Sequence, residues 1–540
     1  MPHRAEPRLL WCLPLNTLLL VAAITIARLI YLAWLCPYNL VEDEAQYWVW
    51  SLRPDWSYYS KGPGIAWSIL TSTRLFGISE FGVRVFAPLY LAVGALAAGG
   101  LAADASGDRR ASFAGAALLL LLPVFALNGT FLMTIDGPMV AFWALACWAG
   151  FRALYRGSSR AWVVLGLSLG LGFLFKYTIA LLLPSLLLAA VIDRKRLRVA
   201  KGLPLLMGTG LALMLLGLLP IAIWNQQNGW PAIAHFLGHA NLPGGDRTQA
   251  SGAMKYTPKW FFEFLGIQLA AIGPALGLMA VGLRTLPRVS EELKSATRFL
   301  GSMGLVTIGF YVLATFFTGV EANWTMGGYV SLTSLAGIVA ARGMADWRER
   351  MKRWRALPEG QRPKEGVVLR RPETPVQILW HCSLAYCIAA SVLMLRIDWL
   401  VKIPGVADRV AVHRLFGAPA LAGAVGEIQK QRTDSQGRPP LVSYHYGVAS
   451  QLTFYLPGHP MVFVAGSHLG YRRTQWDLWP DMSLAQPSLK GGSAVLVGGS
   501  ESQWKTLFGK VTDLGHLPQD LRKDRWVYFG EDFLGPPEKR

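Results

Sequence analysis

Charged residues and cysteines are scarce in this sequence of 540 residues. Only 16% of the residues are Asp, Glu, Lys or Arg, whereas 53% are apolar, and this balance excludes a soluble multidomain protein. The cysteines show no CxxC spacing, and their odd number leaves one without a partner in any disulfide scheme. We therefore interpret them as small apolar residues and expect no disulfide framework. They are Cys12, Cys36, Cys147, Cys382 and Cys387.

Long apolar runs recur along the first three quarters of the chain. A helix needs about 20 residues to cross roughly 30 Å of hydrocarbon, and about eleven runs approach that length. The predicted spans lie near residues 12–35, 82–103, 111–129, 134–151, 161–175, 178–192, 203–223, 261–283, 299–317, 326–341 and 377–398. The sequence therefore predicts an α-helical polytopic membrane protein with about 11 transmembrane helices.

The net charge is +19, and the distribution of the basic residues along the chain follows the order of these spans. Basic residues gather in alternate loops, above all in residues 342–371, which hold ten of them. Because cytoplasmic loops carry an excess of Lys and Arg, we place the N-terminus, with Arg4 and Arg8, in the cytoplasm of a cell (inner) membrane. The basic loop 342–376 lies on the same side, where it meets anionic membrane lipid. No nucleic acid is needed to explain the charge.

The last quarter of the chain has a different pattern. Short β-like runs such as Leu441–Tyr446 and Met461–Ala465 alternate with Gly and Pro turns, and Val448–Tyr455 is a candidate helix. An odd number of spans places this segment outside the cytoplasm. We therefore predict a transmembrane domain over residues 1–398 and an extracytoplasmic (periplasmic) α/β domain over residues 399–540.

An acidic cluster follows directly on the first predicted span, in an external loop of about residues 36–80. Carboxylates at the membrane surface are costly unless they are solvated or used, so Asp43 and Glu44 are either loop acids or functional groups. Lys61 precedes a stiff Gly-Pro-Gly turn, where it either snorkels to headgroups or neutralises the phosphate of a lipid-linked substrate. Aromatic residues of this loop suit a membrane-surface belt and sugar stacking equally well: Tyr47, Trp48, Trp50, Trp56, Tyr58, Tyr59 and Trp67.

Two charged residues interrupt apolar sequence at the outer ends of later spans. Asp136 stands before Gly-Pro at the start of the fourth span, so it is either a helix cap or a carboxylate that faces Asp43 across one cavity. A lysine inside a membrane is expensive, and Lys176 therefore indicates an ion pair or a functional role. His235 and His239 are four residues apart, but no HExxH pattern accompanies them, and we predict no metal site there.

Six segments, taken in order over about the first 345 residues, resemble the polytopic GT-C fold glycosyltransferases. They are DEAQYW, YYSKGPGIAW, LMTIDGP, GLGFLFKYT, PIAIWNQQNGW and EANWTMGGY. Within that fold they resemble the glycosyltransferase family 39 and 83 relatives. These include the protein O-mannosyltransferases, the aminoarabinose transferase of lipid A and the rhizobial lipopolysaccharide galacturonosyltransferases. One departure is SKGPG at Lys61, where many relatives have His-Pro-Pro or Lys-Pro-Pro.

The resemblance implies roles for individual residues. Asp43 would be the catalytic carboxylate, supported by Glu44, and Asp136 would occupy the second acidic position. Lys61 would contact the phosphate of the donor, and we add Lys176 and Arg84 to this phosphate-binding group. The candidate substrate contacts are Tyr59, Tyr177, His239, Glu321 and Asn323.

The resemblance also implies a reaction. A monosaccharide would move from a polyprenyl-phosphate donor to lipid A, lipopolysaccharide, another envelope glycan or a protein on the outer face. Asp43 would act as general base in a single displacement with inversion, because nothing resembles the carboxylate pair of a retaining glycosidase. We expect no obligatory cofactor, and a divalent metal stays open. A transporter or flippase of a lipid-linked substrate and a non-catalytic membrane scaffold are the alternatives.

Overall fold

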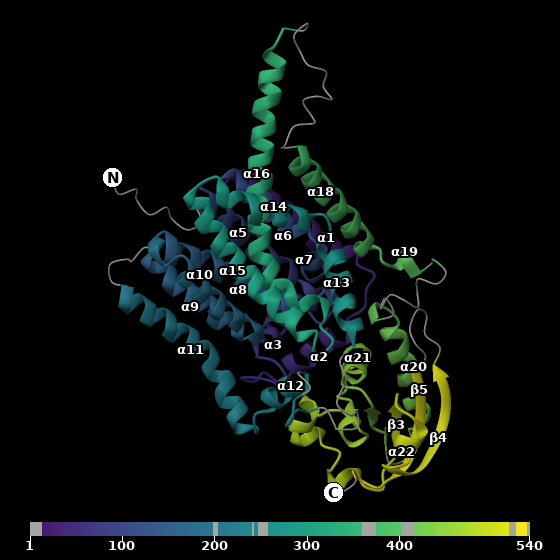
Figure 1. The fold of residues 1–540 in the computed structure, drawn as a ribbon. Helices are drawn as coiled ribbons and strands as arrows, with labels where there is room; N and C mark the ends of the chain where they lie inside the picture. Colours follow the sequence, from purple (N-terminus) through teal and green to yellow (C-terminus); the bar gives the residue numbers. More distant parts are fainter. Residues whose placement is uncertain are drawn as a thin grey trace. The chain divides into compact units, whose positions relative to one another are not determined.

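Figure 1 shows a computed structural model of the chain. It describes residues 13–197, 203–239, 242–246, 257–358, 374–401, 403, 414–433, 435, 437–517 and 525–536. By its internal contacts the chain divides into two compact units. Unit 1 comprises Met1–Trp34, Val85–Leu219 and Tyr256–Leu395, and unit 2 comprises Leu35–Arg84, Pro220–Lys255 and Arg396–Arg540. Unit 2 combines the predicted external loop with the C-terminal segment, and the division at residue 398 stays a prediction.

Unit 1 is built from helices. In chain order they are α1 (Leu15–Trp34), α5 (Phe86–Ser106), α6 (Arg110–Leu121), α7 (Pro123–Thr130), α8 (Asp136–Tyr155), α9 (Ser159–Phe173), α10 (Leu182–Ile192), α13 (Pro258–Ile272), α14 (Ala275–Thr285), α15 (Glu291–Ala314), α16 (Met326–Ala356) and α18 (Thr374–Leu395). α11 (Leu203–Gln227) begins in unit 1 and ends in unit 2.

Several of these helices are long and apolar enough to cross a membrane. Among the described residues there are six such helices, and eight if each of two bent helix pairs counts as one span. The prediction of an α-helical polytopic membrane protein is thereby confirmed. The predicted number of about 11 spans is not, because α9 and the segment Tyr177–Ile192 are shorter than a full crossing requires.

Two predicted spans are broken in the structure, which corrects the expectation of continuous helices over residues 111–129 and 261–283. The first break, between α6 and α7, bends the chain by 68°, and the second, between α13 and α14, bends it by 92°. Pro123 and Pro274 stand at these breaks, and proline lacks the N–H that a continuing helix needs. Gly273 has a φ of 59°, a left-handed conformation that favours glycine.

Two other predicted boundaries have different outcomes. The apolar stretch 161–192 is divided as predicted, since α9 ends at Phe173 and the 3-10 helix η1 (Tyr177–Leu181) leads into α10. The span predicted at 326–341 is longer than expected, because α16 continues to Ala356 and takes up the first part of the basic segment. Residues 359–373 of the predicted loop lie outside the described residues, as do Arg4, Arg8 and Cys12.

Small residues allow the helices of unit 1 to pack closely. A Cβ atom on Gly100 of α5 would lie 2.4 Å from the ring of Trp148 in α8. A Cβ atom on Gly337 of α16 would lie 2.5 Å from the backbone nitrogen of Gly115 in α6. Lipid tails are as apolar as leucine, so such close backbone contact, and not apolar burial, holds membrane helices together.

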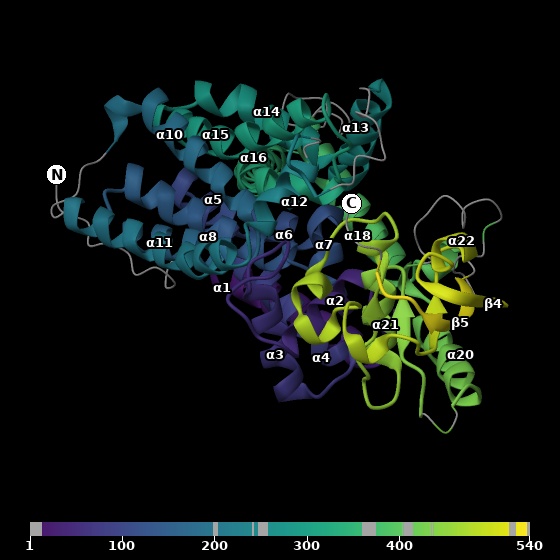
Figure 2. The ribbon, with the colours of Figure 1, turned by 90° about the horizontal axis from the view of Figure 1, so that it is seen from below.

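Unit 2 contains a five-stranded sheet with the order β2-β1-β3-β5-β4. The strands are β1 (Leu441–Ser443), β2 (Phe463–Val464), β3 (Ala494–Val497), β4 (Phe508–Leu517) and β5 (Arg525–Phe533). β1 pairs in parallel with β2 and β3, whereas β5 pairs antiparallel with β3 and with β4, its neighbour in Figure 2. The helices of this unit are α2 (Glu42–Ser51), α3 (Gly64–Phe76), α4 (Glu80–Arg84), α12 (Pro231–His239), α19 (Asp398–Val401), α20 (Ala418–Gln431), α21 (Tyr446–Tyr455) and α22 (Glu501–Trp504).

The α/β character predicted for the C-terminal segment is confirmed. The predicted strands contain β1 and β2, and the predicted helix lies inside α21. β1 ends at Ser443, earlier than predicted, because His445 caps α21: its Nδ1 accepts a hydrogen bond of 3.2 Å from the N–H of Gly447.

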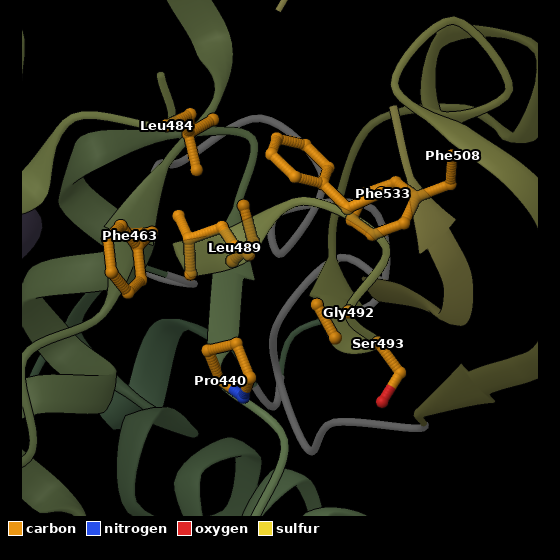
Figure 3. Close-up of a pocket in the computed structure, with 10 residues that line it drawn as sticks. Pro440, Phe463, Leu484, Leu489, Gly492, Ser493, Phe508 and Phe533 are labelled. Carbon is orange, nitrogen blue, oxygen red and sulfur yellow. The ribbon is translucent and has the colours of Figure 1, made fainter. Parts of the chain in front are cut away.

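An apolar pocket lies at one end of the sheet (Figure 3). Among the residues that line it are Pro440, Phe463, Leu484, Leu489 and a tilted pair of aromatic rings, Phe508 of β4 and Phe533 of β5. None of the ten described residues that line this pocket has a charged side chain. Ser493 provides the one polar side chain of this lining, so the pocket offers no ionisable side chain for proton transfer and no cation for a phosphate.

Candidate active site

Helix α2 carries the acidic cluster and is held firmly against α21. Trp48 packs its ring edge-on against Phe454, with 4.9 Å between ring centroids. The backbone of Leu40, just before α2, donates to the Tyr455 hydroxyl at 2.8 Å and accepts from Gln451 at 2.8 Å. These contacts tie the external loop to the C-terminal segment, so the start of α2 has a defined position within unit 2.

Asp43 is the second residue of α2, and its side chain is exposed to solvent. Desolvation by the surrounding protein nevertheless raises the pKa of the Asp43 carboxyl above its ordinary value. The cation Lys61 opposes this rise in pKa most strongly, Glu42 adds to the rise, and Arg414 and Arg472 oppose it more weakly. A raised pKa makes the ionised carboxylate a stronger base, which suits an accessible Asp43 to accept a proton.

Glu44 forms a buried ion pair with Arg84. The Glu44 side chain is 0% exposed and that of Arg84 1%, and their contacts measure 2.6 and 2.9 Å. Arg84 also donates to the carbonyls of Tyr38 and Asn39 at 2.7 and 2.8 Å. With its donors engaged and its surface covered, Arg84 has no face left for a donor phosphate, and our prediction of that role is not supported. The pair instead fixes the chain that leads into α2.

A hydrogen-bonded chain joins the external loop to α12. The Tyr59 hydroxyl donates to Asp246 Oδ2 at 3.0 Å, and His235 Nδ1 lies 2.9 Å from the same oxygen. Desolvation lowers the pKa of His235 to about 4, helped by Lys61 and opposed by the bond to Asp246. The neutral ring then donates through Nδ1 and accepts at Nε2 from His239, 3.1 Å away.

The C-terminal segment contributes several side chains that our sequence reasoning did not place in the site. Arg472 NH2 donates to the Tyr446 hydroxyl at 3.2 Å, and its guanidinium lies over the Tyr446 and Tyr471 rings at 5.1 and 5.8 Å. Glu42 has Arg525 at 3.4 Å and His445 at 3.8 Å. The available signal was the run Tyr471-Arg472-Arg473, which matches no motif, and nothing singled out Asp246.

A second polar cluster lies in unit 1. Asp136 Oδ1 accepts from Lys176 at 2.6 Å, and Oδ2 accepts from Asn323 at 2.7 Å. Asp136 is the first residue of α8 and not its cap, which is Ile135. The structure thus brings together three predicted residues from distant segments and gives Lys176 the ion pair that was one of its two predicted roles.

Other predicted residues have less definite surroundings. Tyr177 is half-buried at the start of η1, and Glu321 is exposed just before the 3-10 helix η4 (Ala322–Thr325). Asp43 and Asp136 belong to different units, and a cavity shared by them stays a prediction. In the described ranges there is no group of three or more His, Cys, Asp or Glu that could hold a metal ion.

The two units together have the fold of the GT-C glycosyltransferases, which confirms the resemblance seen in the sequence. ArnT from Cupriavidus metallidurans bound to undecaprenyl phosphate matches with a TM-score of 0.60 and 16% identity. The match covers 95% of this chain and 97% of that chain. ArnT in the apo state matches with a TM-score of 0.58 at 14% identity. At these identities the likeness shows the fold alone.

Sequence relatives narrow the class further. Residues 60–224 match the family described as dolichyl-phosphate-mannose-protein mannosyltransferase. The chain is 29% identical over 327 residues to lipid A galacturonosyltransferase RgtD of Rhizobium johnstonii, covering 60% of this chain and 65% of that protein. It is 31% identical over 295 residues to the undecaprenyl phosphate-alpha-4-amino-4-deoxy-L-arabinose arabinosyl transferase 1 of Pseudomonas fluorescens, covering 51% and 50%. The matches thus span between half and two thirds of the relatives' lengths.

Proposed function

We propose that this chain is a membrane glycosyltransferase that moves a monosaccharide from a polyprenyl-phosphate donor to lipid A or lipopolysaccharide. The observation that carries the proposal is the environment of Asp43, an accessible carboxyl with a raised pKa on which three cations act. Such a group can accept a hydroxyl proton, and the cations can offset the charge of a departing phosphate. The names of the two sequence relatives support this choice of donor and acceptor.

The proposed reaction is a single displacement. Asp43 takes the proton from an acceptor hydroxyl while that oxygen forms a bond to the anomeric carbon of the donor sugar. The bond between this carbon and the phosphate oxygen breaks, and the polyprenyl phosphate leaves with the electron pair. Lys61 stabilises the negative charge that grows on the phosphate, and attack opposite the leaving group inverts the anomeric configuration.

The proposed location is the cell inner membrane, with the N-terminus in the cytoplasm. The external loop with Asp43 and the C-terminal α/β domain then face the periplasm. Nucleotide sugars are cytoplasmic, so a carboxylate on the outer face requires a donor that crosses the membrane as a lipid. The loop asymmetry of Lys and Arg supports this orientation.

Membranes with and without the protein, supplied with a panel of labelled polyprenyl-phosphate sugars and lipid A, test the proposal. The proposed function requires label on lipid A only in membranes that contain the protein, with an anomeric configuration opposite to that of the donor. Retention of configuration would contradict the single displacement. Passage of the intact lipid-linked sugar across the membrane, with no labelled product, would support the transporter alternative instead.

A further inference from the structure

The C-terminal segment meets the catalytic helix at its first residues. A Cβ atom on Gly447 of α21 would lie 2.5 Å from Cβ of Glu42, the first residue of α2. His445, the cap of α21, lies 3.8 Å from the same glutamate. Tyr446, between these two contact residues, is therefore held close to Asp43 by the packing of α21 on α2.

Arg472 is anchored on this tyrosine. Its guanidinium lies over the rings of Tyr446 and Tyr471, and it donates to the Tyr446 hydroxyl and to the carbonyl of Arg473. A further side-chain hydrogen bond joins it to Tyr471. A guanidinium has five N–H donors, more than these three partners use. Two flat rings hold it in one orientation, so little conformational entropy remains to be lost when it binds a ligand.

The positive charge of Arg472 interacts electrostatically with ionisable groups in three separate segments of unit 2. It acts on Asp43 in α2, on Tyr59 in the external loop, and on His235 and Asp246 around α12. Among the described residues, no carboxylate lies within ion-pair distance of Arg472, and Glu42 has Arg525 at 3.4 Å and His445 at 3.8 Å. A half-buried guanidinium that is preorganised but has no carboxylate partner is suited to bind a phosphate or carboxylate of a ligand.

The geometry points to Arg472 as a binding residue for an oxyanion of one substrate, which the C-terminal segment supplies beside Asp43. This inference rests on the proposed glycosyl transfer and adds to it a role for the C-terminal domain. The oxyanion is either the phosphate of the lipid-linked donor or a phosphate or carboxylate of the acceptor. In both cases the planar fork of arginine provides paired donors that a lysine lacks.

The test compares Arg472→Lys and Arg472→Ala with Arg432→Lys and Arg432→Ala. Arg432 is a matched control because it also lies over an aromatic ring of unit 2, that of Phe529 at 4.8 Å, and it is not among the groups that act on Asp43. We expect Arg472→Ala to raise the KM of one substrate by about 10- to 100-fold, as for loss of a charge-assisted hydrogen bond. Arg472→Lys should give a smaller rise, and the Arg432 variants should stay within twofold of wild type.

The substrate whose KM rises identifies the oxyanion. A rise for the donor alone assigns Arg472 to the lipid phosphate. A rise for lipid A that is absent with dephosphorylated lipid A assigns it to an acceptor phosphate. Unchanged KM values for both substrates in Arg472→Lys and Arg472→Ala, with melting temperatures equal to wild type, would overturn the inference.

A direct binding measurement separates this inference from the proposed function. Purified wild type and Arg472→Ala are titrated with undecaprenyl phosphate and, separately, with lipid A, with Arg432→Ala as control. Weaker binding of either ligand to Arg472→Ala alone supports the inference even if no transfer is found in any membrane. Equal binding of both ligands to all three proteins overturns it, even if the wild type transfers sugar.

Discussion

Replacing Arg84 by methionine tests the role that the structure gives to this residue. Arg84 and Glu44 are almost completely buried and contact each other at 2.6 and 2.9 Å. Arg84→Met leaves a buried carboxylate without its cation, a change that destabilises proteins by about 3–5 kcal/mol. In a domain of about 150–250 residues, a loss of about 1 kcal/mol in unfolding free energy lowers the melting temperature by about 2–4 °C, so we expect a drop of roughly 6–20 °C.

The assay is thermal unfolding of the purified protein in detergent. Arg53→Met is the matched control, because Arg53 pairs with Asp481 in the same unit but the two side chains are 30% and 61% exposed. Exposed pairs contribute only about 0–1 kcal/mol, so this variant should melt close to wild type. The double variant Glu44→Gln with Arg84→Met removes the orphaned charge and should recover part of the loss.

The opposite pattern would refute this reasoning. If Arg84→Met melts like wild type and instead raises the KM of the lipid-linked donor, Arg84 binds the donor phosphate. The buried ion pair with Glu44 would then not be the arrangement of Arg84 in the active enzyme. A double variant less stable than the single one would show that the two residues do not act as a pair.

Three further predictions concern Asp43 and its support. Since the pKa of Asp43 is raised, the apparent pKa of the acid limb of the kcat/KM profile should exceed the ordinary pKa of an aspartate, about 3.9. An apparent pKa at or below that value would contradict the role of Asp43 as base. Because the pKa of Asp43 is higher in the folded than in the unfolded state, ionisation of Asp43 destabilises the fold; this cost is absent below the unfolded-state pKa and complete above the folded-state pKa. Asp43→Asn should therefore melt at or above the wild-type temperature at pH 7, and a clear drop in melting temperature would count against the raised pKa. Gly447→Ala forces a Cβ atom to within 2.5 Å of Glu42 and should cost about 1–3 kcal/mol in denaturant unfolding and reduce transfer, whereas Gly423→Ala, with open space around it, should not.

Local sequence patterns predicted a large part of unit 1. Apolar runs near 20 residues marked most helices. The expense of a membrane lysine indicated an ion pair or a functional role for Lys176, and the structure shows an ion pair with Asp136 at 2.6 Å. The break at Gly273-Pro274 was also visible in the sequence as a glycine before a proline. Run length alone nevertheless favours one continuous span.

The C-terminal share of the candidate site could not be predicted in the same way. Arg472 and Tyr446 reach the acidic cluster only because α21 packs on α2, and that contact joins residues about 400 positions apart in the chain. No periodicity or spacing encodes such a pairing. Arg84 shows the same limit of the sequence: its position fits a phosphate ligand at the membrane surface, but only the tertiary structure shows its buried ion pair with Glu44.

The most direct test of the central claim is label transfer from the productive polyprenyl-phosphate sugar to lipid A by wild type and Asp43→Asn at matched expression. Asp513→Asn serves as control, because Asp513 is an exposed aspartate on β4 of the same unit. A general base contributes roughly 10²–10⁴-fold, so Asp43→Asn should lose at least 100-fold in rate while Asp513→Asn keeps the wild-type rate. Equal rates for wild type and Asp43→Asn would contradict the account.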